Sequence, residues 1–258
     1  MKKYLGGREP ISSKLAVVRN ESDWVVKYRL ILDCRVSGSN DAAERCERIL
    51  LPKAWDIIRD AMALRKACKK HEEVFSFVLD FKDAFYMLPL LSHERRYFTA
   101  YHRGRRYVWS TVAQGSLNGP NASGRLSALT GRMTQAMIES TGARVQIYTD
   151  DPCSVLRGSR CNLRKQIAAM TLSWLCLGWK LSFHKGRWGV EVDWIGFDFK
   201  IMRDKVEAMI KEAFMRDFAR GVQKLRRQRR VQLGVLTSFT GRTGHTANLL
   251  YGWRPFYE

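Results

Sequence analysis

Three aspartates stand at the ends of apolar segments of this chain. Asp80 ends the run VFSFVLD, and Asp150 and Asp151 sit at the tip of a predicted hairpin, VQIYTDDPCSVL. Buried carboxylates repel one another and are costly to desolvate unless a cation neutralises them. Mg²⁺ prefers such hard oxygen ligands, and a pair of these ions stabilises both oxygens of a phosphoryl transfer. The aspartates therefore predict a site for two Mg²⁺ ions and, as a first hypothesis, a nucleotidyl transferase. The alternative is an ordinary turn and cap role.

The charge balance predicts a polyanionic partner. Among 258 residues, 45 Lys and Arg stand against 25 Asp and Glu, a net charge of +20, and nucleic acid is the economical partner. The hydrophobic content of 45% is ample for a packed core, in one large domain or two small ones. No apolar run approaches the roughly 18 residues that span a bilayer, so no membrane partner is expected. The N-terminus lacks the apolar core of a secretion signal, which predicts an intracellular protein, cytoplasmic or nuclear.

The cysteines and histidines give no sign of a further metal or disulfide framework. The six cysteines occur without a C-x-x-C pair, and the five histidines are equally dispersed. We expect reduced, mostly packing cysteines: Cys34, Cys46, Cys68, Cys153, Cys161 and Cys176.

Two elements are expected ahead of Asp80. Residues 24–35 alternate as a strand. One face is apolar and is expected to pack: Val26, Tyr28, Leu30 and Leu32. The other face is expected to look outward: Lys27, Arg29, Asp33 and Arg35. A helix is predicted from Pro52, as its first residue, to about Lys69, with Trp55, Ile58, Met62 and Leu64 on its inner side. The strand that ends at Asp80 follows, and its nearly unbroken apolar character predicts the centre of a sheet.

The later segments mix hairpins and helices. Two strands around a turn at 102–104 are predicted within 96–112, and the stretch QGSLNGPN feeds a helix with an apolar stripe of Ala122, Leu126, Leu129, Met133 and Met137. After the aspartate hairpin comes a helix with Leu163, Ile167, Met170, Trp174 and Leu177 on one stripe, ending at Gly178, and then strands around 187–199. This order predicts an α+β fold, with helices on one face of a largely antiparallel sheet.

The last sixty residues are expected to form a separate helical subdomain. An amphipathic helical stripe is predicted from Val206, Met209, Ile210, Ala213 and Phe214. The basic run from Lys224 to Arg230 fits a nuclear-import signal, a contact with a duplex backbone, or both.

Six segments in this order resemble the reverse transcriptases of LTR-type and retroviral-like retrotransposons, over almost the whole chain. They are KYRLILDCRVSGSN from Lys27, LDFKDAF from Leu79, AQGSLNGP from Ala113, YTDD from Tyr148, GWKLSFHK ending at Lys185, and WIGFDF from Trp194. Four residues such as YTDD recur by chance, whereas six segments in order are specific. The resemblance implies a right-hand polymerase of fingers, palm and thumb that extends a primer with dNTPs on an RNA or DNA template.

The resemblance also implies roles for individual residues. Asp80, Asp150 and Asp151 would hold the metal ions, and Lys185 would protonate the leaving pyrophosphate. The nucleotide would meet Lys27, Arg29, Asp83, Phe85, Gln114, Gly115 and Tyr148, with the Phe85 ring excluding a ribose 2′-hydroxyl. Trp194 and Gly196 would contact the primer. Each residue could also have an ordinary structural role, as a solvated surface, turn or core residue.

The implied domains are fingers at 1–75, a palm at 76–200 with an inserted fingers hairpin near 92–112, and a helical thumb and start of a connection at 201–258. LLYGWRPFYE resembles the entry to the connection region that leads to ribonuclease H in related polyproteins. Ribonuclease H and integrase are absent from this chain, so strand cutting and integration are expected from elsewhere.

Departures from the pattern leave two alternatives open. Pro152 follows the aspartate pair, and a proline there removes a ladder donor and is expected to loosen pairing at the hairpin tip. Ala113 stands where retroviral members often have proline, and few residues precede the basic strand, so the N-terminus is expected to be truncated. The short N-terminus, Pro152 and the missing downstream domains favour an inactive nucleic-acid-binding remnant of a retroelement. An RNA-dependent RNA polymerase shares the carboxylate geometry, but Phe85 argues against it.

Overall fold

The computed structural model describes residues 5, 7, 9–22, 25–44, 47, 49–139, 141–247 and 249. The chain divides into two compact units. Unit 1 comprises Met1–Leu50, Phe81–Leu129 and Gly178–Lys180, and unit 2 comprises Leu51–Asp80, Thr130–Leu177 and Leu181–Glu258. Both mix helices with sheets whose pairings are largely antiparallel, which confirms the predicted α+β class.

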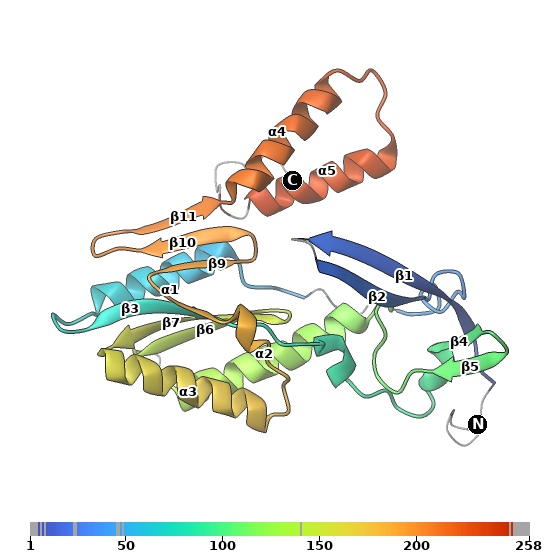
Figure 1. Ribbon diagram of the computed structural model, residues 1–258, viewed down its shortest axis with the longest axis horizontal. Coiled ribbons are helices and arrows are strands. Elements are labelled where there is room, and N and C mark those ends of the chain that lie inside the picture. Colours follow the sequence, from blue (N-terminus) through green and yellow to red (C-terminus); the bar gives the residue numbers. More distant parts are fainter. Residues whose placement is uncertain are drawn as a thin grey trace. The chain divides into compact units, whose positions relative to one another are not determined.

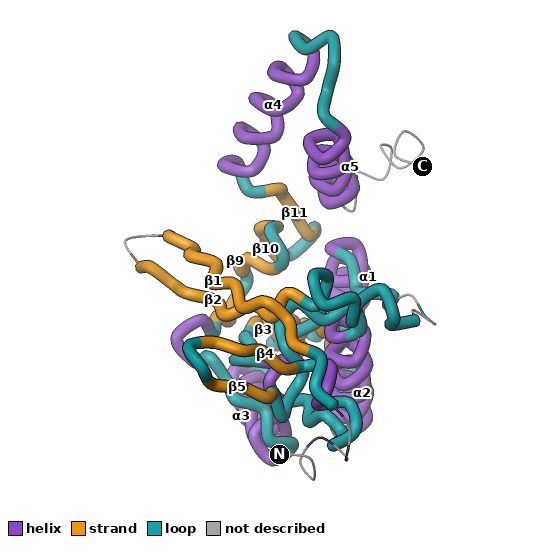
Figure 2. Tube along the Cα trace, turned by 90° about the vertical axis from the view of Figure 1, so that its right-hand side faces the viewer, coloured by secondary structure: helices purple, strands orange, loops and turns teal. Residues whose placement is uncertain are grey.

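Unit 1 contains a sheet in the order β2-β1-β4-β5 (Figure 2). The strands are β1 Ser12–Ser22, β2 Val25–Asp33, β4 Thr99–His102 and β5 Arg105–Val108. The β4–β5 hairpin and its turn confirm the prediction for 96–112, and β2 confirms the basic strand; Trp24 lies outside the described residues. Strand β1, which pairs antiparallel with β2 and parallel with β4, was not predicted.

The apolar face predicted for β2 packs only at its C-terminal end. Leu32 is 1% exposed and belongs to a small core with Cys34, whereas Tyr28 is 69% exposed. Val26 and Leu30 are exposed as well, so the prediction that they pack was wrong. The physical reason is that β1 and β2 pair mainly with each other along their length, and β1 joins β4 only through Ser12 and Ser13.

Two 3₁₀ turns and the first part of helix α2 complete unit 1. The turns are η2 Ala84–Met87 and η3 Arg95–Tyr97, and α2 runs over Gly119–Met137 and continues into unit 2. The apolar stripe predicted for α2 was wrong at Leu129, Met133 and Met137, which are exposed. The buried positions are Gly119, Ser123, Gly124, Ser127, Thr130 and Thr134. The Thr134 hydroxyl donates to the Thr130 carbonyl and accepts the Trp174 indole N–H, so hydrogen bonds offset its burial.

Unit 2 is built on a sheet in the order β6-β7-β3-β8. Its strands are β3 Glu73–Val78, β6 Ala143–Tyr148, β7 Asp151–Gly158 and β8 Arg187–Gly189, and β3 lies between β7 and β8, as its apolar run predicted. Helices α1 Ala54–Lys66 and α3 Arg160–Cys176 cover opposite faces (Figure 1). Trp174 of α3 stacks on Phe77, while Val78, the next residue of β3, packs with α1. The expectation of helices on one face was therefore wrong, because a strand buried on both faces needs two covers.

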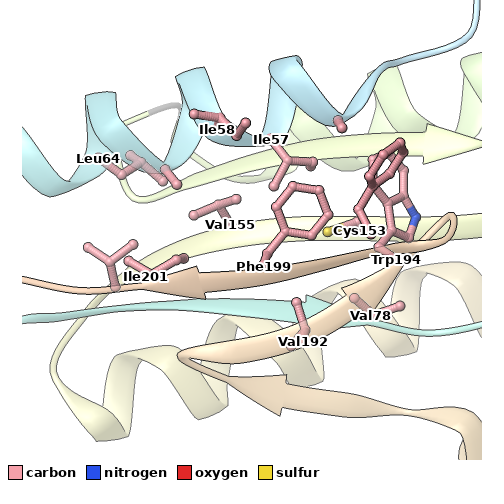
Figure 3. Close-up of a cluster of buried hydrophobic side chains, with 14 residues drawn as sticks. Ile57, Ile58, Leu64, Val78, Cys153, Val155, Val192, Trp194, Phe199 and Ile201 are labelled. Carbon is pink, nitrogen blue, oxygen red and sulfur yellow. The ribbon is translucent and has the colours of Figure 1, made fainter. Parts of the chain in front are cut away.

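A second sheet shares the α1 face of the first. Its strands are β9 Glu191–Trp194, β10 Phe197–Ile201 and β11 Val206–Ile210. Figure 3 shows Trp194, Phe199 and Ile201 from this sheet packed with Ile57 of α1 and Val155 of β7. Val206, Met209 and Ile210 are thus strand residues, and the helix predicted over them was wrong. Ile58 and Leu64 of α1 are buried as predicted, but Trp55 and Met62 are exposed, and the first residue after the N-cap Lys53 is Ala54, not Pro52.

The chain continues with a helical pair, α4 Glu212–Arg226 and α5 Leu233–Ala247 (Figure 2). Phe218 of α4 stacks on Phe239 of α5 at 5.1 Å between ring centroids. The basic run from Lys224 to Arg230 ends α4 and begins the loop between the helices. LLYGWRPFYE lies outside the described residues apart from Leu249. In the described part of the chain, every helix is too short or too polar to cross a membrane.

Candidate active site

The aspartate hairpin is paired to its tip. Tyr148 pairs with Asp151, and Thr149 and Asp150 form the two-residue turn between them. Pro152 is buried and pairs with Ile147, and its carbonyl accepts the Leu79 N–H at 3.2 Å. The expectation that Pro152 loosens the tip was wrong, because the ladder continues past it and its carbonyl still bonds to the strand segment that leads to Asp80.

Left-handed backbone occurs at two β-branched residues of unit 2 and at Asp83 of unit 1. Thr149 has a φ of 54° and Ile195, in the β9–β10 turn, a φ of 43°. Left-handed backbone is rare for β-branched residues and persists where the surrounding structure enforces it, often at functional positions. Asp83, another predicted site residue, has a φ of 56°. The Thr149 hydroxyl donates to Asp150 Oδ1 at 2.7 Å, so it orients this carboxylate, a role that was not predicted from the sequence.

Asp80 has a hydrogen-bond donor on each carboxylate oxygen. Lys185 Nζ lies 2.5 Å from Oδ1, and the buried Ser182 hydroxyl lies 2.7 Å from Oδ2. The Ser182 N–H also donates to the Asp80 carbonyl at 2.9 Å. Both partners belong to the segment around the 3₁₀ turn η4 Phe183–Lys185. Ser182 is a site residue that the sequence did not single out.

The pKa of the third carboxylate, Asp151, is affected by the charges of Asp150 and Asp80. Its pKa rises from 3.8 to about 6, first because the carboxyl is desolvated and then because Asp150 and Asp80 carry like charge, while Lys185 acts in the opposite direction. The three predicted carboxylates and the predicted lysine therefore interact electrostatically within unit 2.

The donor chemistry of this site fits a hard divalent cation. Carboxylate oxygens are the ligands that Mg²⁺ prefers, and an added cation would relieve the repulsion recorded in the Asp151 pKa. In the described residues, however, no three His, Cys, Asp or Glu side chains are grouped around one point that could hold a metal ion. The position next to Asp80 Oδ1 is taken by Lys185.

The shifted Asp151 predicts a specific pH dependence of stability in chelator-treated protein. Because the folded-state pKa is raised, the contribution is present below about pH 4 and is lost as the pH rises through about 6. After discounting for solvent screening, the loss is about 1–2 kcal/mol. Asp151→Asn is therefore expected to be more stable than the wild type at pH 7.5 and to lose this advantage near pH 4, measured by urea unfolding. A variant that is less stable at pH 7.5 would contradict this assignment.

Trp194 supports the aspartate turn from inside the core. Its side chain is 2% exposed, its indole N–H donates to the Asp151 carbonyl at 2.9 Å, and its ring meets Tyr148 edge-on at 6.3 Å. A primer contact at this hairpin would therefore involve the main chain or Gly196, which has a φ of +85°. Tyr148 is half-buried against the same core. Both rings fix the turn that carries Asp150 and Asp151.

The other predicted residues lie in unit 1. Arg29 is exposed on β2; Lys27 lies on the same strand, but its side chain is outside the described part. Asp83 is exposed, and its carbonyl accepts the Tyr86 N–H. Phe85 is half-buried, and its ring would lie 3.3 Å from a Cβ at Gly119, at the start of α2.

The predicted pair Gln114 and Gly115 lies against β2. The Gln114 carbonyl accepts the Leu32 N–H at 2.9 Å, and a Cβ on Gly115 would stand 2.1 Å from the Leu32 carbonyl oxygen. Glycine is thus required here by the approach of β2, in addition to any contact with a nucleotide. Asn40 fixes the same loop, since its side chain donates to the Gly115 carbonyl and accepts the Leu117 N–H. Asn40 was not predicted as a site residue.

Solved structures with a similar fold come from foamy virus. The protease-reverse transcriptase in complex with double-stranded DNA matches with a TM-score of 0.62 and 16% identity, over 95% of this chain and 38% of that one. A second such DNA complex matches with a TM-score of 0.58 and 16% identity, over 90% of this chain and 42% of that one. A complex with an RNA/DNA hybrid matches with a TM-score of 0.57 and 14% identity, over 97% of this chain and 30% of that one.

These matches define a reverse-transcriptase-like fold. The chain spans about two-fifths of the length of the first of these proteins. No family model matches the sequence, and no curated protein does.

Proposed function

We propose that this chain is an RNA-directed DNA polymerase of a retrotransposon, which extends a primer with dNTPs on an RNA or DNA template. The observation that carries the proposal is the position of Asp80, just after β3 and beside the β6–β7 turn that holds Asp150 and Asp151, within a reverse-transcriptase-like fold. The net charge of +20 supports a nucleic-acid partner, as do the nucleic-acid complexes of the similar foamy viral proteins. Cutting of the template strand and integration would come from other domains of a retroelement polyprotein.

In this proposal the three aspartates hold two Mg²⁺ ions. When bound, such ions lower the pKa of a hydroxyl nucleophile and stabilise the charge of a transferring phosphoryl group. Asp80 and Asp150 are the main ligands, with Asp151 assisting. Two contacts in the turn support this: the Thr149 hydroxyl donates to the Asp150 carboxylate, and the Trp194 indole N–H donates to the main-chain carbonyl of Asp151.

The residues of unit 1 provide the nucleotide contacts in this proposal. Arg29, with Lys27 on the same strand, steadies the triphosphate through charge-assisted hydrogen bonds. Asp83, Gln114 and Gly115 lie near the nucleotide, and Phe85 excludes the ribose 2′-hydroxyl.

Substitution of Phe85 separates this proposal from an RNA-dependent RNA polymerase. Phe85→Val is expected to admit ribonucleotides, because the shorter side chain leaves room for a 2′-hydroxyl. The measurement is primer extension on an RNA template with NTPs or dNTPs supplied separately, and Phe98→Val serves as a control at another partly buried phenylalanine. A Phe85→Val enzyme that gains no ribonucleotide incorporation would remove the sugar-gate role.

A nonenzymatic remnant of a mobile element is the second candidate. Two findings favour it: Lys185 is paired with Asp80, and no three His, Cys, Asp or Glu side chains among the described residues are grouped to hold a metal ion. Both candidates predict salt-sensitive template binding, because phosphate contacts release counterions. Extension by the wild-type protein separates them: it is expected for the polymerase and absent for the remnant.

A further inference from the structure

Lys185 forms an ion pair with Asp80, one of the proposed metal ligands. Its ammonium lies on Asp80 Oδ1, and its charge is among those that act on Asp151. The Asp80 side chain is 16% exposed, so its charge is poorly hydrated, whereas the Lys185 side chain is 47% exposed. A poorly hydrated carboxylate facing two others requires a positive partner, and in this structure the partner is an amine.

The rest of the Asp80 environment keeps the carboxylate in place without Lys185. The hydroxyl and the N–H of Ser182 hold Oδ2 and the main-chain carbonyl of Asp80, and both come from a buried residue. Lys185, by contrast, follows at the end of a short 3₁₀ turn with a solvent-exposed, four-carbon side chain. One donor on Asp80 is therefore fixed, and the other has room to leave toward solvent.

We propose that Lys185 is an internal substitute for the metal, which occupies Asp80 in the metal-free protein and is displaced from it when a divalent cation binds. The ion pair keeps the carboxylates compatible with folding before the metal arrives. The inference rests on the proposed metal role of Asp80. It adds a positioning function for Lys185 that differs from proton donation to pyrophosphate.

The amine reactivity of Lys185 reports its displacement directly. The full chain is labelled with limiting acetylating reagent, with and without saturating Mg²⁺, and the labelled lysines are quantified by mass spectrometry. Mg²⁺ is expected to raise labelling of Lys185 several-fold and to leave the exposed Lys165 of α3 unchanged. In Asp80→Asn, Lys185 is expected to react at the high rate whether or not Mg²⁺ is present. Equal labelling with and without Mg²⁺ in the wild type would overturn the proposal.

Metal affinity gives a second, independent readout. Lys185→Met is expected to bind Mn²⁺ about fivefold more tightly than the wild type, the equivalent of about 1 kcal/mol for a partly exposed ion pair. It is also expected to unfold at a lower temperature than the wild type in chelator. Lys165→Met is the charge-matched control and should change neither quantity. Unchanged affinity in Lys185→Met would contradict the competition between amine and metal.

These outcomes are separable from the proposed polymerase activity. If the wild-type protein extends primers but the labelling of Lys185 does not change with Mg²⁺, the proposed function stands and the displacement of Lys185 is wrong. If Mg²⁺ raises the labelling of Lys185 but the protein extends no primer, the displacement of Lys185 stands and the proposed function is wrong.

Discussion

Asp150→Asn is expected to lower the turnover of primer extension by on the order of a thousandfold or more, about 4 kcal/mol of transition-state stabilisation. The substitution removes a charge from the turn between β6 and β7, where Thr149 donates to the Asp150 carboxylate, while the amide retains an oxygen that accepts this hydrogen bond. Fold and template binding should therefore persist while the metal ligand is lost. Single-turnover extension at saturating dNTP is the measurement.

The control for this prediction is Asp204→Asn. Asp204 is exposed in the loop between β10 and β11 and has no role in the proposed site. A far smaller loss in Asp204→Asn than in Asp150→Asn is expected. An Asp150→Asn protein that keeps wild-type turnover would remove the metal assignment.

Trp194→Ala is expected to destabilise the protein by about 3–5 kcal/mol. The indole is 2% exposed, fills the core between β9, β10 and α1, and donates to the Asp151 carbonyl (Figure 3). Truncation would leave a cavity and an unpaired carbonyl beside the aspartate turn. Urea unfolding measures the loss, with Trp55→Ala as the control, because Trp55 is 55% exposed and its truncation should change the stability by about 0.5 kcal/mol or less.

Trp194→Phe removes the hydrogen-bond donor and keeps part of the packing. Because phenylalanine is smaller than the indole, the expected cost in stability lies between about 1 kcal/mol for the hydrogen bond alone and the cost of Trp194→Ala. Turnover in this variant is expected to fall more than template affinity, because the Asp151 carbonyl loses its anchor while the basic surface is unchanged. Wild-type stability and turnover in Trp194→Phe would show that the indole N–H has no part in holding the turn.

The buried strands near the aspartates could be predicted because their residue pattern has a single good solution. The run ending at Asp80 is too apolar for an exposed strand, and the hairpin around Asp150 consists of two largely apolar segments joined by a two-residue turn. The segment from Val206 to Ile210 was wrongly predicted as a helix because Val206, Met209 and Ile210 fit helical spacing. In the observed strand, the residues that pack on the core are Val206, Ala208 and Ile210. Short apolar runs of this kind do not distinguish the two.

Other features depend on contacts that no local pattern contains. The buried residues of α2 are glycines, serines and threonines, and the burial of Thr134 is understandable only once the Trp174 indole is placed on its hydroxyl. The apolar residues of β2 were expected to pack, but their exposure depends on where β1 pairs. Likewise, Ser182 and Lys185 meet Asp80 across more than a hundred residues of sequence. Candidate site residues could be proposed from the sequence, whereas their hydrogen-bond partners could not be predicted.

The most direct test is extension of a labelled primer on an RNA template, with Mg²⁺ and dNTPs, by the wild-type chain and Asp150→Asn at equal template occupancy. The polymerase proposal predicts extension by the wild type and its loss in the variant. A folded, template-bound wild-type protein that adds no nucleotide would contradict the proposal and favour a binding remnant.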